Sequence, residues 1–547
     1  MTRSSLEIGA GLSPARPPRR ILAGEGIHVV GVAGAGASAA ALLATAAGAR
    51  VDGCDLSAGS PYTPALEAAG VQRYLGHDPA HLRTATRPDR LAVSKALTAV
   101  EPDHPELGAA RALGIPVEPW QQVVADAAVG RRLIGVAGTH GKSTSAGWLV
   151  HLLVAGGMDP SAFVGALLAP DLTGGIAATA RIGQGEPFVV EADEYAGNFD
   201  PFRPSVVLLT SAEWDHPDVF ADRTAVVDAF ESWLRRAGPA SDGGPPTLIA
   251  NVGDAGVAEI VDRLRGWEGR LLAVALADSA DGSPGAAAAE LADRHGTALG
   301  PAAALVGRIT ATSPAGTSVE LDGHGLIDLA RPVHSGSAGS TASARAAGRP
   351  RSPIVVRLRT AGRHNAANAL GVAGTAAALG LASEAIISGL ASFTGVGRRL
   401  ERKGESHGVV VYDDYGHHPT AIRATLAAVR QLEPGRRLWV ACEPLTYHRT
   451  AALLGDLAAA LATADAVAIA DIWAGRDLDT TVVTAGDLAA ATARSRPGMP
   501  VHAPGSVEAT ADWLAAEVRP GDAVLVMGGG RSYRIAERLL ERLAENE

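Results

Sequence analysis

Cysteine is almost absent from this sequence of 547 residues: Cys54 and Cys442 are the only two, and they lie in unrelated stretches. This scarcity excludes a disulfide-stabilised secreted scaffold and is typical of a reducing cytoplasm, where we expect the protein to reside. We expect both cysteines to be core residues. Aromatic residues make up only 4% of the chain, whereas it contains 65 glycines. Such a composition favours α/β packing of small residues over a β-sandwich.

Long apolar runs and an excess of positive charge are also missing. No stretch of about 18 apolar residues is free of charged side chains, so we expect no transmembrane helix. The formal net charge of −10 argues against nucleic acid or an anionic membrane as a partner, because both bind basic surfaces. Residues 1–25 contain several arginines and prolines but no apolar core of a signal peptide. We predict that they form a disordered tail.

The length of the chain exceeds what one hydrophobic core usually serves, and we expect three α/β domains. Apolar strands followed by glycine turns and Ala/Leu-rich helices recur along the chain, which predicts parallel sheets. We place the domains at residues 26–129, 130–392 and 393–547, the first and third Rossmann-like and the central one like a P-loop ATPase. A Ser/Gly-rich stretch within about 326–352 cannot bury much apolar surface, so we predict a flexible insertion there.

The most informative motif is a glycine turn that begins the central domain. The run 132–137 predicts a buried strand and 145–154 predicts a helix, and the turn lies between them. Backbone N–H groups of such a turn face an anion, Lys142 adds a positive charge, and Ser143 offers a hydroxyl to Mg²⁺. We therefore predict a nucleoside triphosphate site rather than a bland surface turn. Its residues are Gly138, Thr139, His140, Gly141, Lys142, Ser143 and Thr144.

Acidic residues follow the next two predicted strands of the central domain. Glu191–Glu194 follows the first strand, and Glu213–His216 follows the second. Ligands gather at the carboxyl ends of parallel strands, so we expect both clusters to converge on the glycine turn and form a metal-and-phosphate site. The alternatives are a solvated loop acid for Glu191 and a structural hydrogen bond for His216.

Further polar residues of the central domain are suited to a nucleoside. Asn251 and Asp254 follow a fourth strand, and His364, Asn365 and Asn368 lie at the start of an Ala/Leu-rich helix. His364 and Asn365 are equally compatible with helix capping.

The first domain opens with a second glycine turn. Gly34, Gly36 and Ser38 follow an apolar strand, and Asp55 ends the next one. This pattern is similar to a dinucleotide-binding fingerprint, although it reads G-x-G-x-x-A. On its own it leaves open NAD(P), another nucleotide diphosphate, or a structural turn.

In the third domain a buried strand, 408–412, leads into Asp413–Pro419. His417 and His418 beside two aspartates suggest a metal. Because neighbouring residues on an extended loop point apart, a shared metal is the less favoured interpretation.

Taken together, these motifs resemble the Mur ligases over about residues 27–545, apart from the insertion. The motifs that carry the resemblance are Gly138–Thr144, Glu191–Glu194, Asp215–His216, Gly362–Asn368, Gly397–Arg399 and Asp413–Pro419. The resemblance implies an ATP-dependent ligase that joins L-alanine to UDP-N-acetylmuramate through an acyl phosphate during peptidoglycan precursor synthesis. It also implies a first domain that binds a UDP-sugar rather than NAD(P). We expect a monomer or dimer.

The resemblance also implies roles for individual residues. Lys142, Glu191, His216 and Arg398 would be catalytic, and Ser143, Glu191 and His216 would hold the metal. The UDP-sugar would contact Gly34, Gly36, Ser38, Asp55 and Ser94, and the amino acid would contact Tyr415, His417 and Arg449. ATP would contact the glycine turn, Asn251, Asp254, His364, Asn365, Asn368 and Asp414.

Two departures from the family pattern bear on the incoming amine. Segment 217–236 has no lysine, so the carbamylated lysine of the ligases for later amino acids is absent, which agrees with the L-alanine-adding branch. The family sequence Gln-Pro-His-Arg-Tyr-Ser-Arg-Thr is replaced here by Glu443–Thr450, with Leu445 and Thr446 in place of His and Arg. A murein-tripeptide ligase and a degenerate ligase that only binds nucleotides therefore remain alternatives.

Overall fold

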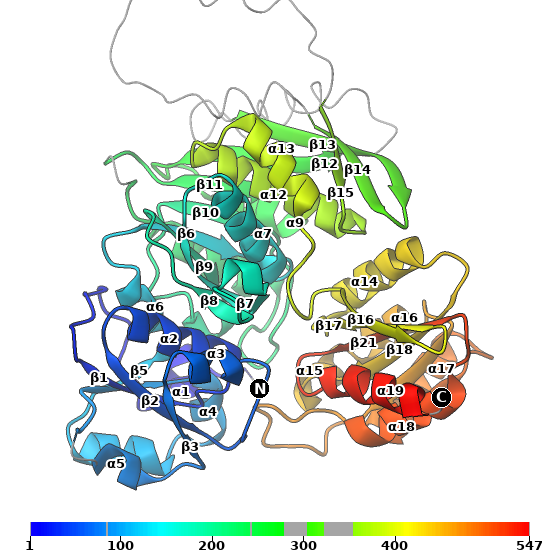
Figure 1. The fold of residues 1–547 in the computed structure, drawn as a ribbon, viewed down its shortest axis with the longest axis horizontal. Coiled ribbons are helices and arrows are strands. Elements are labelled where there is room, and N and C mark those ends of the chain that lie inside the picture. Colours follow the sequence, from blue (N-terminus) through cyan, green and yellow to red (C-terminus); the bar gives the residue numbers. More distant parts are fainter. Residues whose placement is uncertain (1, 84–85, 241–242, 278–302, 322–353, 546–547) are drawn as a thin grey trace, which may run out of the picture.

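A computed structural model of the chain describes residues 2–83, 86–240, 243–277, 303–321 and 354–545. Three β-sheets divide it into three α/β domains, the first and central ones side by side and the third beside both (Figure 1). This architecture agrees with the predicted fold class. The predicted insertion, about 326–352, lies outside the described residues. In the part of the chain that the structure describes, no helix is long and apolar enough to cross a membrane.

The first domain is built on a five-stranded parallel sheet in the order β3-β2-β1-β4-β5. Every residue of β1 is buried, because helices and loops cover both faces of the sheet. The strands are β1 (Gly26–Val30), β2 (Arg50–Asp55), β3 (Gln72–Leu75), β4 (Arg90–Val93) and β5 (Val117–Pro119). The helices are α2 (Ala35–Ala46), α3 (Thr63–Ala68), η1 (Pro79–Arg83), α4 (Lys95–Val100), α5 (Pro105–Ala112) and α6 (Trp120–Ala127).

The central domain has a ten-stranded sheet in the order β15-β14-β13-β12-β11-β10-β6-β9-β7-β8. Its inner strands are parallel, whereas β8, β14 and β15 pair in antiparallel fashion at the two edges. The strands are β6 (Arg132–Ala137), β7 (Ser161–Leu168), β8 (Ala178–Arg181), β9 (Pro187–Ala192), β10 (Val206–Leu209), β11 (Thr247–Asn251), β12 (Arg270–Ala277), β13 (Ala303–Ser313), β14 (Gly316–Leu321) and β15 (Ile354–Leu358). The helices are α7 (Lys142–Ala155), η2 (Pro170–Leu172), η3 (Tyr195–Gly197), α8 (Arg223–Leu234), α9 (Ala255–Arg263), α12 (Arg363–Ala378) and α13 (Ser383–Ser392).

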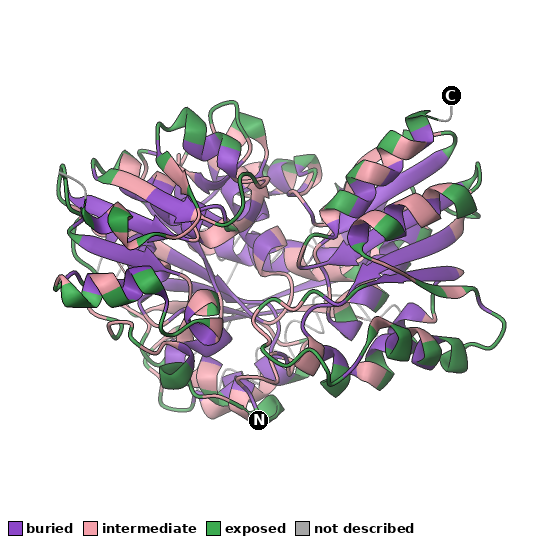
Figure 2. Ribbon diagram, turned by 90° about the horizontal axis from the view of Figure 1, so that it is seen from below, coloured by how far each residue is buried: buried purple, intermediate pink, exposed green. Residues whose placement is uncertain are grey.

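The third domain has a six-stranded sheet in the order β16-β17-β21-β18-β19-β20. Strand β21 lies in its interior and is buried along its whole length, while α19 is amphipathic and packs on the sheet through Ile535, Leu539 and Leu543. The burial pattern in Figure 2 shows buried strands beneath helices with exposed outer faces. The strands are β16 (Glu401–Ser406), β17 (Val409–Asp414), β18 (Arg437–Glu443), β19 (Ala466–Ala470), β20 (Val501–Gly505) and β21 (Asp522–Gly528). The helices are α14 (Pro419–Leu432), α15 (Tyr447–Ala452), α16 (Leu454–Leu461), α17 (Ala485–Ser495), α18 (Val507–Glu517) and α19 (Tyr533–Glu545).

The N-terminal segment is ordered, so the prediction of a disordered tail over residues 1–25 was wrong. Residues Ser5–Ile8 form helix α1, whose N-terminus carries a capping box, and Ile8 is fully buried against the first and central domains. Arg16 forms ion pairs with Glu118 at 2.6 Å and Asp126 at 2.7 Å. These partners lie about one hundred residues further along the chain, where no local sequence pattern reveals them.

Candidate active site

A cavity of about 580 Å³ lies where the three domains meet. All three domains contribute side chains to its wall, because the carboxyl ends of several parallel strands open toward it. Most of the site residues predicted from the sequence line this cavity: Gly36, Ser94, Thr139, His140, Gly141, Lys142, Ser143, Thr144, Glu191, His216, Asn251, Asp254, His364, Asn365, Asn368, Asp414, Tyr415 and His417.

The glycine turn connects β6 to α7 at the floor of the cavity. Gly141 is the N-cap of α7 in the left-handed conformation, with φ of 79°, and a Cβ there would lie 2.5 Å from Asn368 Oδ1. The left-handed conformation therefore requires glycine here, and a side chain would in addition displace the amide of Asn368. The first turn of α7 directs its free N–H groups toward the cavity, which is the arrangement that binds phosphate.

Lys142 is held by the acids that follow β9. Its Nζ donates to Gly138 O at 2.6 Å and to Glu194 Oε2 at 2.9 Å, and lies 3.7 Å from Asp193 Oδ1. Burial opposes its charge, but Glu194 and Asp193 raise the pKa of Lys142, so the ammonium stays positive. The sequence correctly predicted that the acids at this strand end converge on the turn.

The three predicted metal ligands lie in two neighbouring groups. Ser143 Oγ donates to Glu191 Oε1 at 2.9 Å, while His216 lies with Asp193 and Glu194, whose ligand atoms are all within 4.8 Å of one another. Burial lowers the pKa of His216 to about 4, although Asp215 opposes the shift. Its imidazole is thus neutral near pH 7. The carboxylate and hydroxyl oxygens fit the ligand preference of Mg²⁺.

The predicted nucleoside residues border the turn. Asp254 caps α9 by accepting from Gly256 N and Val257 N at 3.0 Å, and Asn251 Nδ2 donates to Thr210 O at 2.9 Å. The helix-capping interpretation of His364 and Asn365 was wrong, because Gly362 is the N-cap of α12 and no side chain caps it. Burial lowers the pKa of His364 to about 4, and so a neutral ring faces the cavity.

In the first domain, Gly36 packs so closely on Trp120 that a Cβ would come within 2.2 Å of that ring.

Ser38 was wrongly predicted as a substrate contact. It is fully buried, and its Oγ lies 3.0 Å from Thr179 Oγ1, which joins α2 to the central domain. Gly34 is the N-cap of α2, and Asp55 Oδ2 accepts from Ala33 N at 3.0 Å. Gly34 and Asp55 do not line the cavity, and Gly138 of the central domain does not line it either.

The two arginines of the Gly397–Arg399 motif have different roles. Arg398 lies inside the third domain, where its Nε donates to Asp413 Oδ2 at 3.0 Å and its Nη2 donates to Gly528 O and Ser532 Oγ. Arg399 instead crosses the domain boundary and donates to Ser143 Oγ at 2.8 Å. Arg398 does not line the cavity, and Arg399 is the arginine that reaches the glycine turn. These contacts favour Arg399 over Arg398, whose catalytic role stays a prediction.

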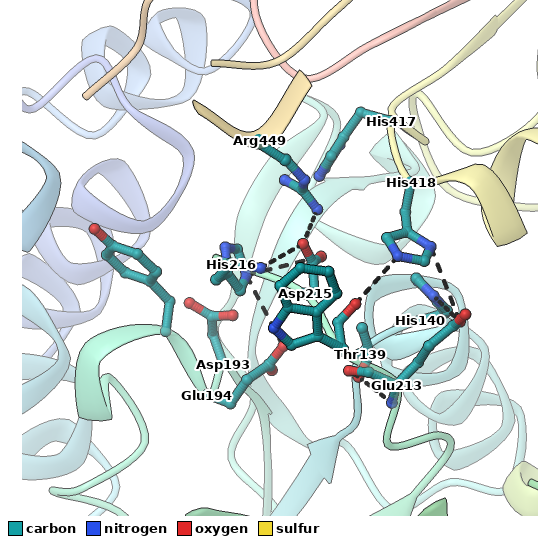
Figure 3. Close-up of polar contacts among 12 residues, drawn as sticks. Thr139, His140, Asp193, Glu194, Glu213, Asp215, His216, His417, His418 and Arg449 are labelled. Carbon is teal, nitrogen blue, oxygen red and sulfur yellow. Dashed lines mark hydrogen bonds and ion pairs between the residues drawn. The ribbon is translucent and has the colours of Figure 1, made fainter. Parts of the chain in front are cut away.

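The remaining third-domain residues support the cavity wall. Asp414 accepts from Gly416 N at 2.7 Å and Leu400 N at 2.8 Å, which shapes the loop that carries Tyr415 and His417. Arg449 is buried and donates to Asp215, beside His216 (Figure 3). Burial opposes ionisation, but Arg449 holds the pKa of Asp215 well below its usual value, so this contact between domains is an ion pair.

Sequence reasoning missed Arg476, which lines the cavity from the loop after β19. Its Nε donates to Asp218 Oδ2 at 2.8 Å, its Nη2 lies 2.9 Å from His216 Nδ1, and its guanidinium stacks on the Tyr195 ring. A lone arginine in a polar loop carries no motif, so nothing local could have identified it. Glu213 was noted only as part of a cluster, yet it accepts from His140 Nε2 (Figure 3). It also accepts from Thr420 Oγ1 and so links the central and third domains.

Three α/β domains around a phosphate-binding turn define a nucleotide-dependent enzyme whose substrates meet between domains. Residues 26–132 match the sequence pattern "Mur ligase family, catalytic domain", and residues 398–530 match "Mur ligase, glutamate ligase domain". The chain is 34% identical over 540 residues to UDP-N-acetylmuramate–L-alanine ligase of Frankia casuarinae, covering 94% of this chain and 97% of the relative. It is 36% identical over 505 residues to the ligase of that name from Acidothermus cellulolyticus, covering 92% and 91%.

Solved structures agree at the level of the fold. The crystal structure of UDP-N-acetylmuramate–alanine ligase from Thermotoga maritima has a TM-score of 0.69 at 21% identity and covers 95% of this chain and 100% of its own. A murein peptide ligase from Psychrobacter arcticus has a TM-score of 0.64 at 23% identity, covering 95% and 99%. The chain belongs to the Mur ligase family.

Proposed function

We propose that this protein is an ATP-dependent ligase that joins L-alanine to UDP-N-acetylmuramate in the cytoplasm, as a step of peptidoglycan precursor synthesis. The observation that carries the proposal is the cavity between the domains, in which a phosphate-binding turn meets walls from both flanking domains. The names of the relatives that match nearly the whole chain support the substrates. The proposal keeps the predicted domain limits 26–129, 130–392 and 393–547, with the first domain extended by the N-terminal segment. It also keeps a monomer or dimer as the oligomeric state.

The chemistry requires activation of a carboxylate. An oxygen of the lactyl carboxylate attacks the γ-phosphorus of ATP, ADP leaves, and an acyl phosphate forms. The amine of alanine then attacks the acyl carbon, inorganic phosphate leaves, and the amine loses its proton. Lys142 and the N–H groups of α7 face the transferring phosphoryl group and stabilise its growing negative charge. Arg399 adds a second cation beside Ser143.

Ser143, Glu191 and His216 are the residues that would hold Mg²⁺, with Asp193 and Glu194 as neighbours of His216. When bound, Mg²⁺ would neutralise charge on the phosphate oxygens. His364, Asn251 and Asp254 border the turn and would contact the adenosine.

The domain contacts protect the acyl phosphate from hydrolysis. Arg449 pairs with Asp215, and Thr420 Oγ1 donates to Glu213 Oε1 at 2.7 Å, so the third domain closes against the central one. Exclusion of water by such closure prevents loss of a reactive intermediate.

The proposed function is tested by measuring ADP release from ATP and UDP-N-acetylmuramate with a panel of amines. We expect turnover with L-alanine, and hydroxylamine trapping should detect the acyl phosphate. Activity only with the murein tripeptide would overturn the alanine assignment. Binding of both nucleotides without any acyl phosphate would instead show a degenerate ligase.

We propose that Arg476 binds the carboxylate of the incoming amino acid. Leu445 and Thr446, which replace the His and Arg of the family pattern, carry no charge that could bind it. It lines the cavity next to His216, and a guanidinium forms strong bonds to a carboxylate. Arg476→Ala is expected to raise KM for L-alanine by at least about tenfold while KM for ATP changes little. Arg476→Lys should recover part of the affinity. An unchanged KM for L-alanine in the folded alanine variant would contradict this role.

A further inference from the structure

A second cluster of ligand-type side chains lies in the first domain and does not line the cavity. It comprises His28 on β1, Cys54 on β2, His81 on η1 and Glu106 on α5. Four separate elements therefore deliver one side chain each to the same point, on the face of the sheet that η1 and α5 cover. None of these residues is used by the proposed reaction.

The cluster is compact, and three of its four side chains are closed to solvent, while His81 is partly exposed. One ligand atom from each of the four residues lies within 4.8 Å of all the others. Cys54 Sγ is 3.1 Å from Glu106 Oε2, His81 Nδ1 is 2.7 Å from Glu106 Oε1, and His28 Nε2 is 3.8 Å from Glu106 Oε2. His28, Cys54 and Glu106 have no exposed surface. Two histidine nitrogens, a sulfur and a carboxylate oxygen form a ligand set suited to zinc.

An unpartnered nitrogen inside the cluster points independently to a ligand. His28 Nε2 is buried and has no hydrogen-bond partner among the described residues, although leaving such an atom unpaired is costly. The other ring nitrogen, Nδ1, lies 2.7 Å from Asp52 Oδ1. Burial opposes the charge of His28, but Asp52 and Glu106 raise its pKa to about 9, so both ring nitrogens carry protons in the metal-free protein. A metal would displace the Nε2 proton to solvent, and the Nε2 lone pair would then face Cys54 and Glu106. Metal-bound histidines are commonly oriented by a carboxylate in this way.

We propose that His28, Cys54, His81 and Glu106 bind one zinc ion, which fastens β1, β2, η1 and α5 together. Cys54 loses its thiol proton to solvent when the metal binds, because the thiolate is the ligand form. His77 Nδ1 lies 3.1 Å from Cys54 Sγ, and it borders the site as a neighbour. The expectation that Cys54 is a core residue is confirmed, because it is buried in a hydrophobic cluster with Val30 and Leu91, although its Sγ contacts Glu106.

The test uses the full-length protein and compares Cys54→Ser with Cys442→Ser, the other buried cysteine of the chain. Cobalt(II) added to the metal-free protein should give a thiolate-to-metal charge-transfer band in wild type and Cys442→Ser, and no such band in Cys54→Ser. Zinc measured after dialysis should be near one equivalent in the first two. Excess Mg²⁺ and ATP, which occupy the cavity, should leave the band unchanged.

A second variant keeps the proposal falsifiable if Cys54→Ser does not fold. His81→Ala alters a partly exposed ligand and should weaken zinc binding by roughly 10- to 100-fold, with a matching loss of the zinc-induced rise in melting temperature. Absence of both the cobalt band and bound zinc in wild type would overturn the proposal and show a hydrogen-bonded cluster only. Equal zinc content in wild type and folded Cys54→Ser would overturn it too.

Discussion

Replacing Lys142 by alanine is expected to lower the rate of ADP formation by about 10²-fold or more. The ammonium lies at the glycine turn and stays charged despite burial, because Glu194 and Asp193 stabilise it. When ATP binds, the same charge faces the phosphoryl group, where negative charge grows in the transition state. Steady-state kinetics with saturating L-alanine measures the effect.

The fold should tolerate this change. Burial raises the pKa of Glu194 to about 7 even with Lys142 opposing the shift, so the carboxyl can take up a proton when the lysine is lost. Lys403→Ala is the matched control, since Lys403 pairs with Glu401 on β16 and does not line the cavity. Near-normal kinetics of a folded Lys142→Ala variant would refute the assigned phosphate site.

The second large effect separates two adjacent arginines. Arg399→Ala is expected to lower kcat by about 10²-fold with little loss of stability, because Arg399 donates to Ser143 across the domain boundary. Arg398→Ala is expected to cost about 3 kcal/mol of unfolding free energy, because it leaves Asp413 buried without its cation. Thermal or urea unfolding and turnover, measured on both variants, give the two readouts.

Conservative variants sharpen this comparison. Arg398→Lys keeps a charge beside Asp413, so it should recover part of the stability and leave turnover near that of the wild type. If a folded Arg398→Lys variant loses turnover while Arg399→Ala keeps it, the assignment of the catalytic arginine to Arg399 is wrong.

The sequence predicted the parts of the site that depend on short contiguous segments. The glycine turn lies between β6 and α7 as expected, since its conformation depends on glycines at positive φ followed at once by a helix start. The acids after β9 and β10 converge on that turn because the carboxyl ends of parallel strands meet at one edge of a sheet.

The errors concern contacts between distant segments. Residues 1–25 lack the apolar content of a core, yet Arg16 orders this segment by pairing with Glu118 and Asp126. Ser38 follows the glycine turn as a ligand residue would, but Thr179 of the central domain covers it.

What the sequence by itself determined is the family, the order of strands and turns, and the phosphate-binding end of the site, because these depend on local patterns of residue type. Only the tertiary structure decided which arginine of the Gly397–Arg399 motif reaches Ser143, that Arg476 enters the cavity, and that Cys54 lies among histidines. The reason is physical: side-chain direction and the packing of remote elements set these contacts, and neighbouring residues on one segment point to different sides.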